Sequence, residues 1–194
     1  MTTRQQILKV IYPLFAFFNR ILKRNQGIFS SKKPAIQSFY NLKSTLTHGD
    51  EFDFSQLKNK KVLIVNTASD CGYTAQYGDL EKLFELHKNK LEVIAFPAND
   101  FQKQESKEDH AIATFCKQNY GVTFPLMRKS KVVIHSTQNK VYEWLTDKDK
   151  NGWNTNEPSW NFCKYLVDEK GNLTHFFESS EPPLGKNILA AIEE

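Results

Sequence analysis

Two buried strands joined through a helix set the fold class of this chain. Residues Lys61–Thr67 form an unbroken, largely β-branched apolar run, and Leu91–Phe96 form a second run that Pro97 ends. Between them, Thr74–Lys88 carries apolar residues at helical spacing. Strands that are apolar on both faces lie inside a sheet that helices cover. The order strand, helix, strand therefore predicts an α/β domain with two central strands side by side.

The rest of the chain predicts further elements around this centre. A strand pair, Ser38–Leu42 with Glu51–Phe54, turns at His48-Gly49-Asp50, and a hairpin joins Trp160–Val167 to Leu173–Phe177 through a loop with Gly171. We also expect a helix that Ser106 caps, helices over Val141–Leu145 and Asn187–Ile192, and short strands over Phe124–Met127 and Val132–His135. These elements make a mixed central sheet flanked by helices.

Composition excludes several classes of protein. The three cysteines, Cys71, Cys116 and Cys163, are too few for a disulfide scaffold, and no Cys/His cluster has zinc-site spacing, so we expect no metal and no cofactor. Residues 1–35 hold seven of the 26 basic side chains and no acidic one. Residues 36–194 therefore carry 19 basic and 22 acidic side chains, a net charge of −3, which argues against a nucleic-acid binder.

The front end is a basic amphipathic segment. On a helical wheel, Ile7–Arg24 gathers its Ile, Leu and Phe side chains on one half and its basic residues on the other, with Pro13 inside the pattern. This pattern favours a helix lying on an anionic membrane surface. Docking on the protein itself, an oligomer contact and a targeting or export segment remain alternatives. We divide the chain into an extension and linker, residues 1–35, and a domain, residues 36–194, and expect a cytoplasmic, membrane-associated protein.

Cys71 is the residue that points to chemistry. It lies between the strand Lys61–Thr67 and the helix that starts near Thr74. Free N–H groups and the helix dipole at such a terminus favour a thiolate, so we expect a lowered pKa. The alternative is an inert, buried cysteine. Position 74 is a threonine, so there is no Cys-x-x-Cys pair of the disulfide-reductase kind.

Four segments carry a family resemblance. They are Asn66-Thr-Ala-Ser-Asp-Cys-Gly-Tyr-Thr74, Phe96-Pro-Ala-Asn-Asp-Phe-Gln-Lys-Gln-Glu105, Phe115–Met127 and Trp160-Asn-Phe-Cys-Lys-Tyr-Leu-Val167. In this order and spacing they resemble the motifs of glutathione peroxidases, over about residues 38–193. The resemblance implies a thioredoxin-like fold and the reduction of hydrogen peroxide or of organic or lipid hydroperoxides.

The resemblance also assigns roles to residues. It implies Cys71 as the nucleophile that attacks the peroxide, supported by Gln104, Trp160 and Asn161. Their amide and indole N–H groups are uncharged donors that can hold a thiolate and a proton-carrying substrate. Gln102 competes with Gln104 for this role, and the motif register favours Gln104.

The segment Phe115–Met127 resembles the one that holds the resolving cysteine in thioredoxin-dependent members. The resemblance therefore implies that Cys116 forms an intramolecular disulfide with Cys71, and that thioredoxin rather than glutathione reduces it. Cys116 shares an apolar helix face with Ile112 and Phe115, a setting typical of a structural cysteine. Because a disulfide needs Cα atoms within about 7 Å, we expect Ser106–Asn119 to be mobile. Cys163 is interpreted as structural.

Departures from the family motifs leave further expectations. Asp100 replaces a glutamine and would raise the pKa of Cys71 if it pointed inward. The stretch Asp147–Ser159 is short, without the inserted loop that supports tetramers in some members, so we expect a monomer or dimer. The alternative function is a peroxide sensor that passes its disulfide to a client protein.

Overall fold

The central sheet follows the predicted strand, helix, strand order. A computed structural model describes residues 27–194. Strands β4 (Lys61–Thr67) and β5 (Leu91–Pro97) pair in parallel, and helix α2 (Gln76–His87) connects them. All seven residues of β4 are buried because the strand lies in the middle of the sheet, with helices on both faces. The predicted α/β centre is confirmed.

Antiparallel strands complete a five-stranded sheet with the order β1-β7-β6-β4-β5. Strand β6 (Lys164–Val167) pairs with β4 and with β7 (Leu173–Phe177), and Gly171 supplies the positive φ of 83° that the turn requires. The predicted strand Trp160–Val167 is too long at its start. Residues 160–163 form a turn because the Asn66 carbonyl accepts the Phe162 N–H, and Phe162 adopts a φ of 70°.

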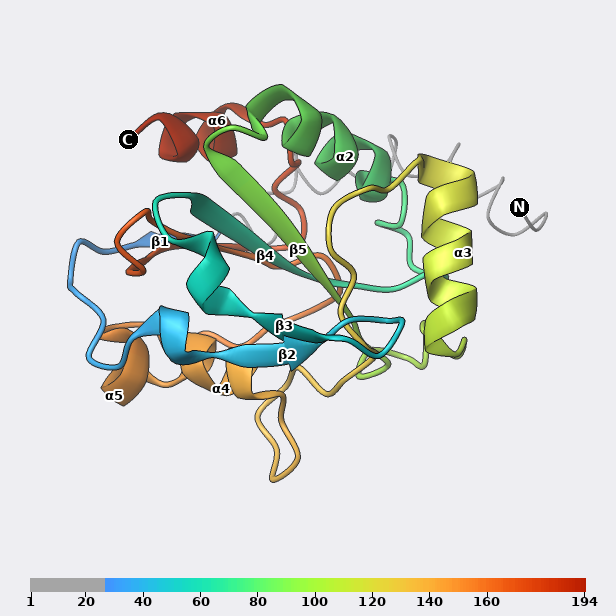
Figure 1. Cartoon of the computed structure of the whole chain (residues 1–194), viewed down its shortest axis with the longest axis horizontal. Helices are drawn as coiled ribbons and strands as arrows, with labels where there is room; N and C mark the ends of the chain where they lie inside the picture. The colour runs from blue at the N-terminus through green and yellow to red at the C-terminus, as the bar shows by residue number, and fades with distance from the viewer. Residues whose placement is uncertain (1–26) are drawn as a thin grey trace.

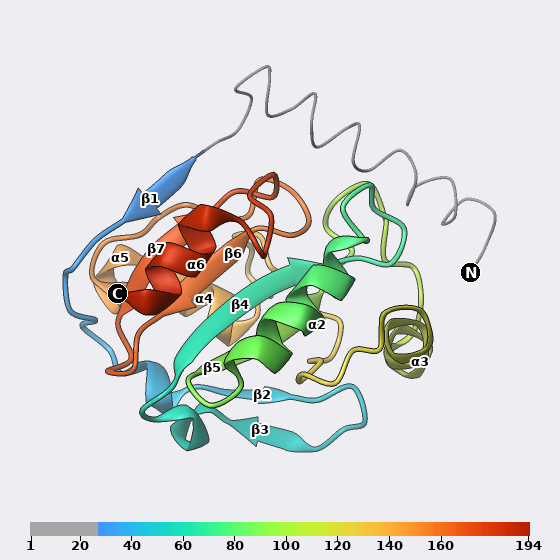
Figure 2. The same ribbon diagram turned by 90° about the horizontal axis from the view of Figure 1, so that it is seen from above.

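Helices cover the two faces of the sheet. Helices α2 and α6 (Lys186–Glu193) lie on one face, and α4 (Lys140–Thr146) and α5 (Lys148–Asn151) lie on the other (Figures 1 and 2). Alternate residues of β4 point to opposite faces, so Leu63 belongs to the core under α2, whereas Ile64 belongs to the core under α4. The predicted helices over Val141–Leu145 and Asn187–Ile192 are confirmed, each slightly longer than expected.

The strand pair before β4 is shifted from its prediction. The paired strands are β2 (Lys43–Thr45) and β3 (Glu51–Asp53), whereas Phe39–Asn41 forms the short 3-10 helix η1 and Phe54–Leu57 forms η2. The predicted strand Ser38–Leu42 is therefore wrong. Phe39 is fully buried against Phe54 and Trp144, and the tight 3-10 turn delivers its ring into that core.

Helix α3 (Asp109–Tyr120) follows β5 and stands at the edge of the molecule (Figure 1). Its N-cap residue is Glu108 and no side chain caps it, so the predicted Ser106 cap is wrong. The expected strand Phe124–Met127 is reduced to isolated bridges, Ala95 with Leu126 and Leu46 with Met127, and the expected strand Val132–His135 is wrong because these residues form neither strand nor bridge. Pro125 has no N–H to give to a longer ladder, so the pairing stops there.

The predicted linker contributes a strand to the sheet. Residues Ile28–Ser30 form β1, which pairs antiparallel with β7 as an edge strand. The predicted boundary lies between residues 35 and 36. Strand β1 lies before this boundary, yet its backbone is hydrogen-bonded to the central sheet of the domain. The amphipathic segment Ile7–Arg24 lies outside the described residues. Within residues 27–194, no helix has the length and the hydropathy that a membrane span requires.

Candidate active site

Cys71 lies in a tightly held turn after β4. Its backbone N–H donates to Thr74 Oγ1 over 3.0 Å, and the Thr74 hydroxyl lies within 2.9 Å of two acceptors, the carbonyls of Ala68 and Cys71. Helix α2 begins only at Gln76. Four residues therefore separate Cys71 from the first helical residue, so the thiol lies farther from the helix than the sequence suggests.

Burial dominates the ionisation of Cys71. The side chain has no solvent exposure. Burial raises the pKa of the thiol, and donor contacts from the Tyr73 N–H, Asn161, Trp160 and the Gly72 N–H oppose this rise without reversing it. The predicted lowered pKa is therefore wrong for this conformation, because desolvation outweighs the donors and the helix terminus is several residues away.

The other predicted site residues gather around this thiol. Tyr73 N–H donates to Cys71 Sγ over 3.4 Å, and the side chains of Asn161 and Trp160 face the same sulfur. Asn161 Nδ2 donates to Gln104 Oε1 over 3.0 Å. Residues that are up to 90 positions apart in sequence therefore form one cluster of uncharged donors.

The turn before β6 orients the side chains of Trp160 and Asn161 toward the Cys71 sulfur. Asn66 Nδ2 donates to the Trp160 carbonyl over 2.9 Å, and the buried Phe162 ring packs edge-on against Tyr77 at 5.5 Å. A left-handed φ in a non-glycine residue such as Phe162 costs free energy and persists only where surrounding contacts enforce it. These contacts point Asn161 toward the sulfur rather than along a strand.

Glu105 is a buried residue of this site to which the sequence reasoning gave no role. Its Oε2 accepts from Ser69 N over 2.7 Å and from Ser69 Oγ over 2.8 Å, and Asp70 N donates to the Gln104 carbonyl. Glu105 therefore ties the turn that holds Cys71 to the loop that holds Gln104. The only sequence signal was its place directly after Gln104 in the family-like motif.

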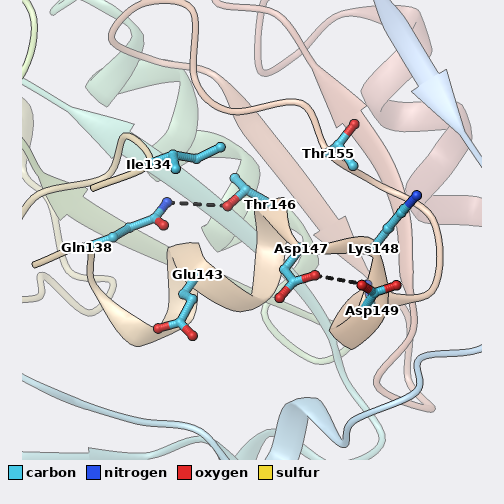
Figure 3. Close-up of a pocket in the computed structure, with 8 residues that line it drawn as sticks. All are labelled: Ile134, Gln138, Glu143, Thr146, Asp147, Lys148, Asp149 and Thr155. Carbon is cyan, nitrogen blue, oxygen red and sulfur yellow. Dashed lines mark hydrogen bonds between the residues drawn. The ribbon is translucent and has the colours of Figure 1, made fainter. Parts of the chain in front are cut away.

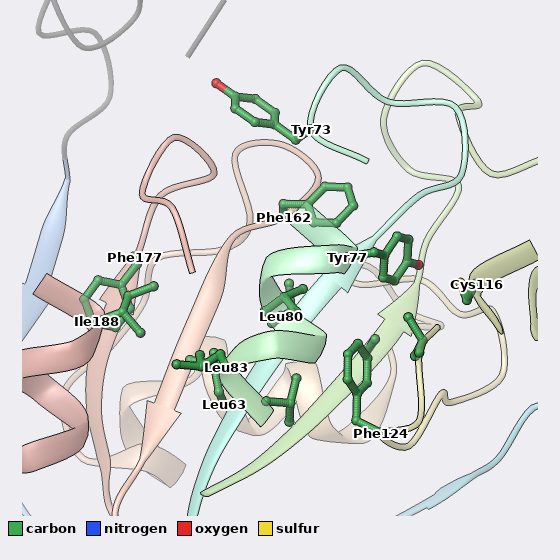
Figure 4. Close-up of a cluster of buried hydrophobic side chains, with 14 of the residues drawn as sticks. Leu63, Tyr73, Tyr77, Leu80, Leu83, Cys116, Phe124, Phe162, Phe177 and Ile188 are labelled. Carbon is green, nitrogen blue, oxygen red and sulfur yellow. The ribbon is translucent and has the colours of Figure 1, made fainter. Parts of the chain in front are cut away.

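Cys116 lies on α3, buried in the core that also contains Cys71 (Figure 4). Burial raises the pKa of its thiol to about 12, although the nearby Tyr77 hydroxyl lowers it slightly. Ile112 and Phe115 are buried on the same helix. All three cysteines are reduced in this structure.

Three other residues stand apart from the cluster. Cys163 is buried in the core on the opposite face of the sheet, near Ser159 and Glu178, and burial raises its pKa to about 11. Gln102 is exposed, so Gln104 is the amide that reaches Asn161. Asp100 pairs with Lys131 over 3.1 Å and accepts from Val132 N–H, so it is turned away from the thiol.

A surface pocket of about 320 Å³ lies beside α4 and α5 (Figure 3). It contains none of the predicted site residues, and several of its polar groups bond to one another: Gln138 donates to Thr146, and Asp147 accepts from the Asp149 N–H. We therefore locate the active site at Cys71. The pocket is lined by Ile134, Gln138, Glu143, Thr146, Asp147, Lys148, Asp149 and Thr155.

Comparison with known proteins decides the family. Residues 39–146, more than half of the chain, match the model of the family described as glutathione peroxidase. The chain belongs to the glutathione peroxidase family. It is 43% identical to glutathione peroxidase-like peroxiredoxin 2 of Saccharomyces cerevisiae, over 75% of this chain and 90% of that protein. It is 42% identical to glutathione peroxidase-like peroxiredoxin GPX5 of Chlamydomonas reinhardtii, over 75% of this chain and 89% of that protein. As a member of this family, the protein described here is a peroxidase, as its sequence motifs implied.

Solved structures agree. The crystal structure of Trgpx in apo form covers 82% of this chain and 98% of its own, with a TM-score of 0.62 and 34% identity. A thioredoxin family protein from Chlorobium tepidum TLS matches at a TM-score of 0.54 over 84% and 96% of the two chains, with 13% identity. That second likeness concerns the fold alone, and it confirms the predicted thioredoxin-like architecture of this glutathione peroxidase.

Proposed function

We propose that this protein reduces hydroperoxides through Cys71. The sulfur attacks one oxygen of the peroxide, the O–O bond breaks, and Cys71 becomes a sulfenic acid. The thiol proton ends on the departing oxygen, so a hydroperoxide leaves as an alcohol, or as water when the substrate is hydrogen peroxide. The observation that carries this proposal is the buried sulfur surrounded by the uncharged donors of Tyr73, Trp160 and Asn161.

The raised pKa of Cys71 fits this chemistry. A thiol that stays protonated in the resting enzyme keeps its proton available for the leaving oxygen. Neutral donors stabilise the negative charge that develops on sulfur and oxygen in the transition state. They do so without placing a positively charged side chain in the resting site. Gln104 supports this set because it holds the Asn161 amide from the other side.

We further propose that Cys116 resolves the sulfenic acid and that thioredoxin reduces the resulting disulfide. Cys116 shares a core with Cys71, and its thiol is buried under an intact helix turn. The bond requires α3 to open locally so that the two Cα atoms come within about 7 Å. An opened α3 also exposes the disulfide to a protein reductant.

Mass spectrometry after one equivalent of hydrogen peroxide tests both steps. We expect a Cys71–Cys116 disulfide in the wild-type protein, a trappable sulfenic acid in Cys116→Ser, and no oxidation product at position 71 in Cys71→Ser. Cys163→Ser is the matched control because Cys163 lies in the other core, and it should form the same disulfide as wild type. A disulfide that instead involves Cys163 would contradict the assignment.

Turnover identifies the reductant. We expect peroxide consumption with thioredoxin, thioredoxin reductase and NADPH to exceed consumption with glutathione and glutathione reductase by at least about tenfold. Faster turnover with glutathione would contradict the proposal. Slow turnover with both reductants, together with mixed disulfides to other proteins, would favour the sensor function instead.

We propose lipid hydroperoxides as substrates and peripheral membrane contact as the means of reaching them. The support is the basic amphipathic pattern of Ile7–Arg24, followed by Ile28 and Phe29, which are 40% and 43% exposed on the edge strand β1. The full-length double variant Phe17→Ser/Phe18→Ser keeps the charge and removes apolar area. It should lose binding to vesicles containing anionic lipid and lose phospholipid hydroperoxide turnover, with hydrogen peroxide turnover retained. Unchanged vesicle binding would contradict the membrane contact.

A further inference from the structure

Three buried oxygen atoms near the active site have no hydrogen-bond partner in the described part of the chain. They are Thr67 Oγ1 on β4, the Tyr77 hydroxyl on α2 and Glu105 Oε1 on the loop before α3. Buried polar atoms are normally paired, so an unpaired group needs an explanation, and a catalytic role is one. Two of them, the Tyr77 hydroxyl and Glu105 Oε1, belong to residues that act on the buried thiol of Cys116.

Tyr77 and Glu105 are the two of these groups that act on Cys116. The Tyr77 hydroxyl points toward Cys116 (Figure 4), and its donor contact, looser than a formed hydrogen bond, lowers the pKa of that thiol. The Glu105 carboxylate acts on both groups, since its negative charge raises the pKa of Cys116 and of Tyr77. Tyr77 therefore lies within electrostatic reach of both the thiol and the carboxylate.

Glu105 has the properties of a proton acceptor. It has no solvent exposure, and burial raises the pKa of its carboxyl group above the ordinary value. Ser69 occupies only Oε2, so Oε1 is free to take a proton. Lys107, the cation that acts on Glu105, pairs with Asp70 over 3.2 Å, so within residues 27–194 Glu105 has no ion pair of its own.

We propose that Glu105 accepts the proton of Cys116 during disulfide formation, with the Tyr77 hydroxyl as carrier. The inference rests on the proposed function, in which Cys116 attacks the Cys71 sulfenic acid. These atoms are unpaired in the resting structure, so the step begins when the Tyr77 hydroxyl shifts to bridge the Cys116 thiol and Glu105 Oε1. The Cys116 proton then moves to the Tyr77 oxygen while the Tyr77 proton moves to Glu105 Oε1. The new S–S bond then replaces the Cys71 S–O bond, and Glu105 returns the proton to the departing hydroxide. The products are the disulfide and water, with no outside oxidant or reductant.

Two physical arguments make this step useful. Burial raises the pKa of Cys116 to about 12, so this thiol is protonated at pH 7 and the resolving step needs a base. A thiolate without a partner is costly to keep in an apolar core. Transfer of the proton therefore also favours the departure of Cys116 from its pocket, which is the local opening of α3 that disulfide formation requires.

Stopped-flow fluorescence of the full-length protein after mixing with hydrogen peroxide tests the proposal. The first, peroxide-dependent phase reports sulfenic acid formation, and the second, peroxide-independent phase reports the disulfide. In wild type, the second phase should slow as pH falls through the raised pKa of Glu105. Glu105→Gln, which keeps an acceptor for Ser69, should slow the second phase about 10²-fold or more and abolish this acid-side pH dependence.

Three further variants separate proton transfer from positioning. Tyr77→Phe should also slow the second phase, and Glu105→Asp, which restores a carboxylate, should recover the pH dependence. Ser69→Ala weakens only the tie between the loops and should keep the pH dependence. A Glu105→Gln protein whose second phase keeps the wild-type rate and pH profile would overturn the inference, and so would a Tyr77→Phe protein with an unaltered second phase. Absence of a Cys71–Cys116 disulfide in wild type would instead overturn the proposed function.

Discussion

At the scale of single residues, Cys71 shows burial and hydrogen bonding acting against each other on one atom. Its sulfur is removed from water, which favours the neutral thiol, while four donors favour the thiolate. Desolvation is the larger effect. The peroxidase therefore keeps a protonated thiol at position 71 in this structure, and its reactivity depends on how the proton is transferred as the O–O bond breaks.

This balance predicts the pH dependence of alkylation. Because the pKa of Cys71 lies above the ordinary thiol value of 9.0, the thiolate fraction, and with it the iodoacetamide rate constant, should still be rising at pH 9. The measurement is alkylation of Cys71 between pH 6 and 10 in a Cys116→Ser/Cys163→Ser background. A rate that levels off below pH 8 would mean that the donors outweigh desolvation.

A second prediction uses two neighbouring glutamines. Gln104 touches Asn161, whereas Gln102 is exposed with a φ of 50° that glycine adopts easily. Gln104→Ala should lower the rate of Cys71 oxidation by hydrogen peroxide about 10-fold to 10²-fold, because Asn161 loses its partner. Gln102→Gly should change this rate less than about twofold. Equal losses in both variants would argue against the cluster as the source of rate enhancement.

At the scale of elements, the packing of α3 holds Cys116 in the core, whereas the proposed disulfide requires Cys116 to leave it. The helix ends in a left-handed Gly121 whose N–H bonds to the carbonyls of Cys116 and Lys117, and its first residue, Asp109, accepts from Arg128 Nε and from the Lys129 N–H. Cys116 is thus held by ties at both ends of the helix. In the resting fold α3 is a regular helix, so the mobility of Ser106–Asn119 stays a prediction for the reaction.

Hydrogen exchange measures this opening. In the reduced protein, amides of residues 112–120 should be protected, and peroxide should increase their exchange at least about tenfold, since Cys116 leaves the core to reach Cys71. Cys116→Ser, which forms a sulfenic acid but no disulfide, is the control and should keep its protection. Equal deprotection in wild type and in the control would assign the opening to Cys71 oxidation alone.

At the scale of the whole molecule, Lys164 couples stability to pH. It is fully buried on β6, where its Nζ donates to the carbonyls of Ser179 and Glu181. Burial lowers its pKa to about 7. Between this value and the ordinary lysine pKa the unfolded chain binds more protons than the folded one, so the lysine makes stability rise with pH over that window and has no such effect below it.

Urea denaturation at pH 7, 8 and 9 checks this linkage. Relative to wild type, Lys164→Met should show a smaller rise, or a larger fall, in the free energy of unfolding as pH increases, because the titrating group is gone. Lys148→Met, at an exposed position, should reproduce the wild-type trend. A Lys164→Met protein with the same pH slope as wild type would show that Lys164 stays charged in the folded state.

The sequence by itself determined the strand, helix, strand centre, the family and the identity of the residues around Cys71. Periodicity and apolar runs are local properties, and motif order along the chain is sufficient for a resemblance. Only the tertiary structure decided the pKa of Cys71, the turn at Trp160–Cys163, the strand β1 and the buried place of Glu105. These depend on which distant segments exclude water from a group and which atoms then remain to pair with it, and neither is encoded in any local pattern.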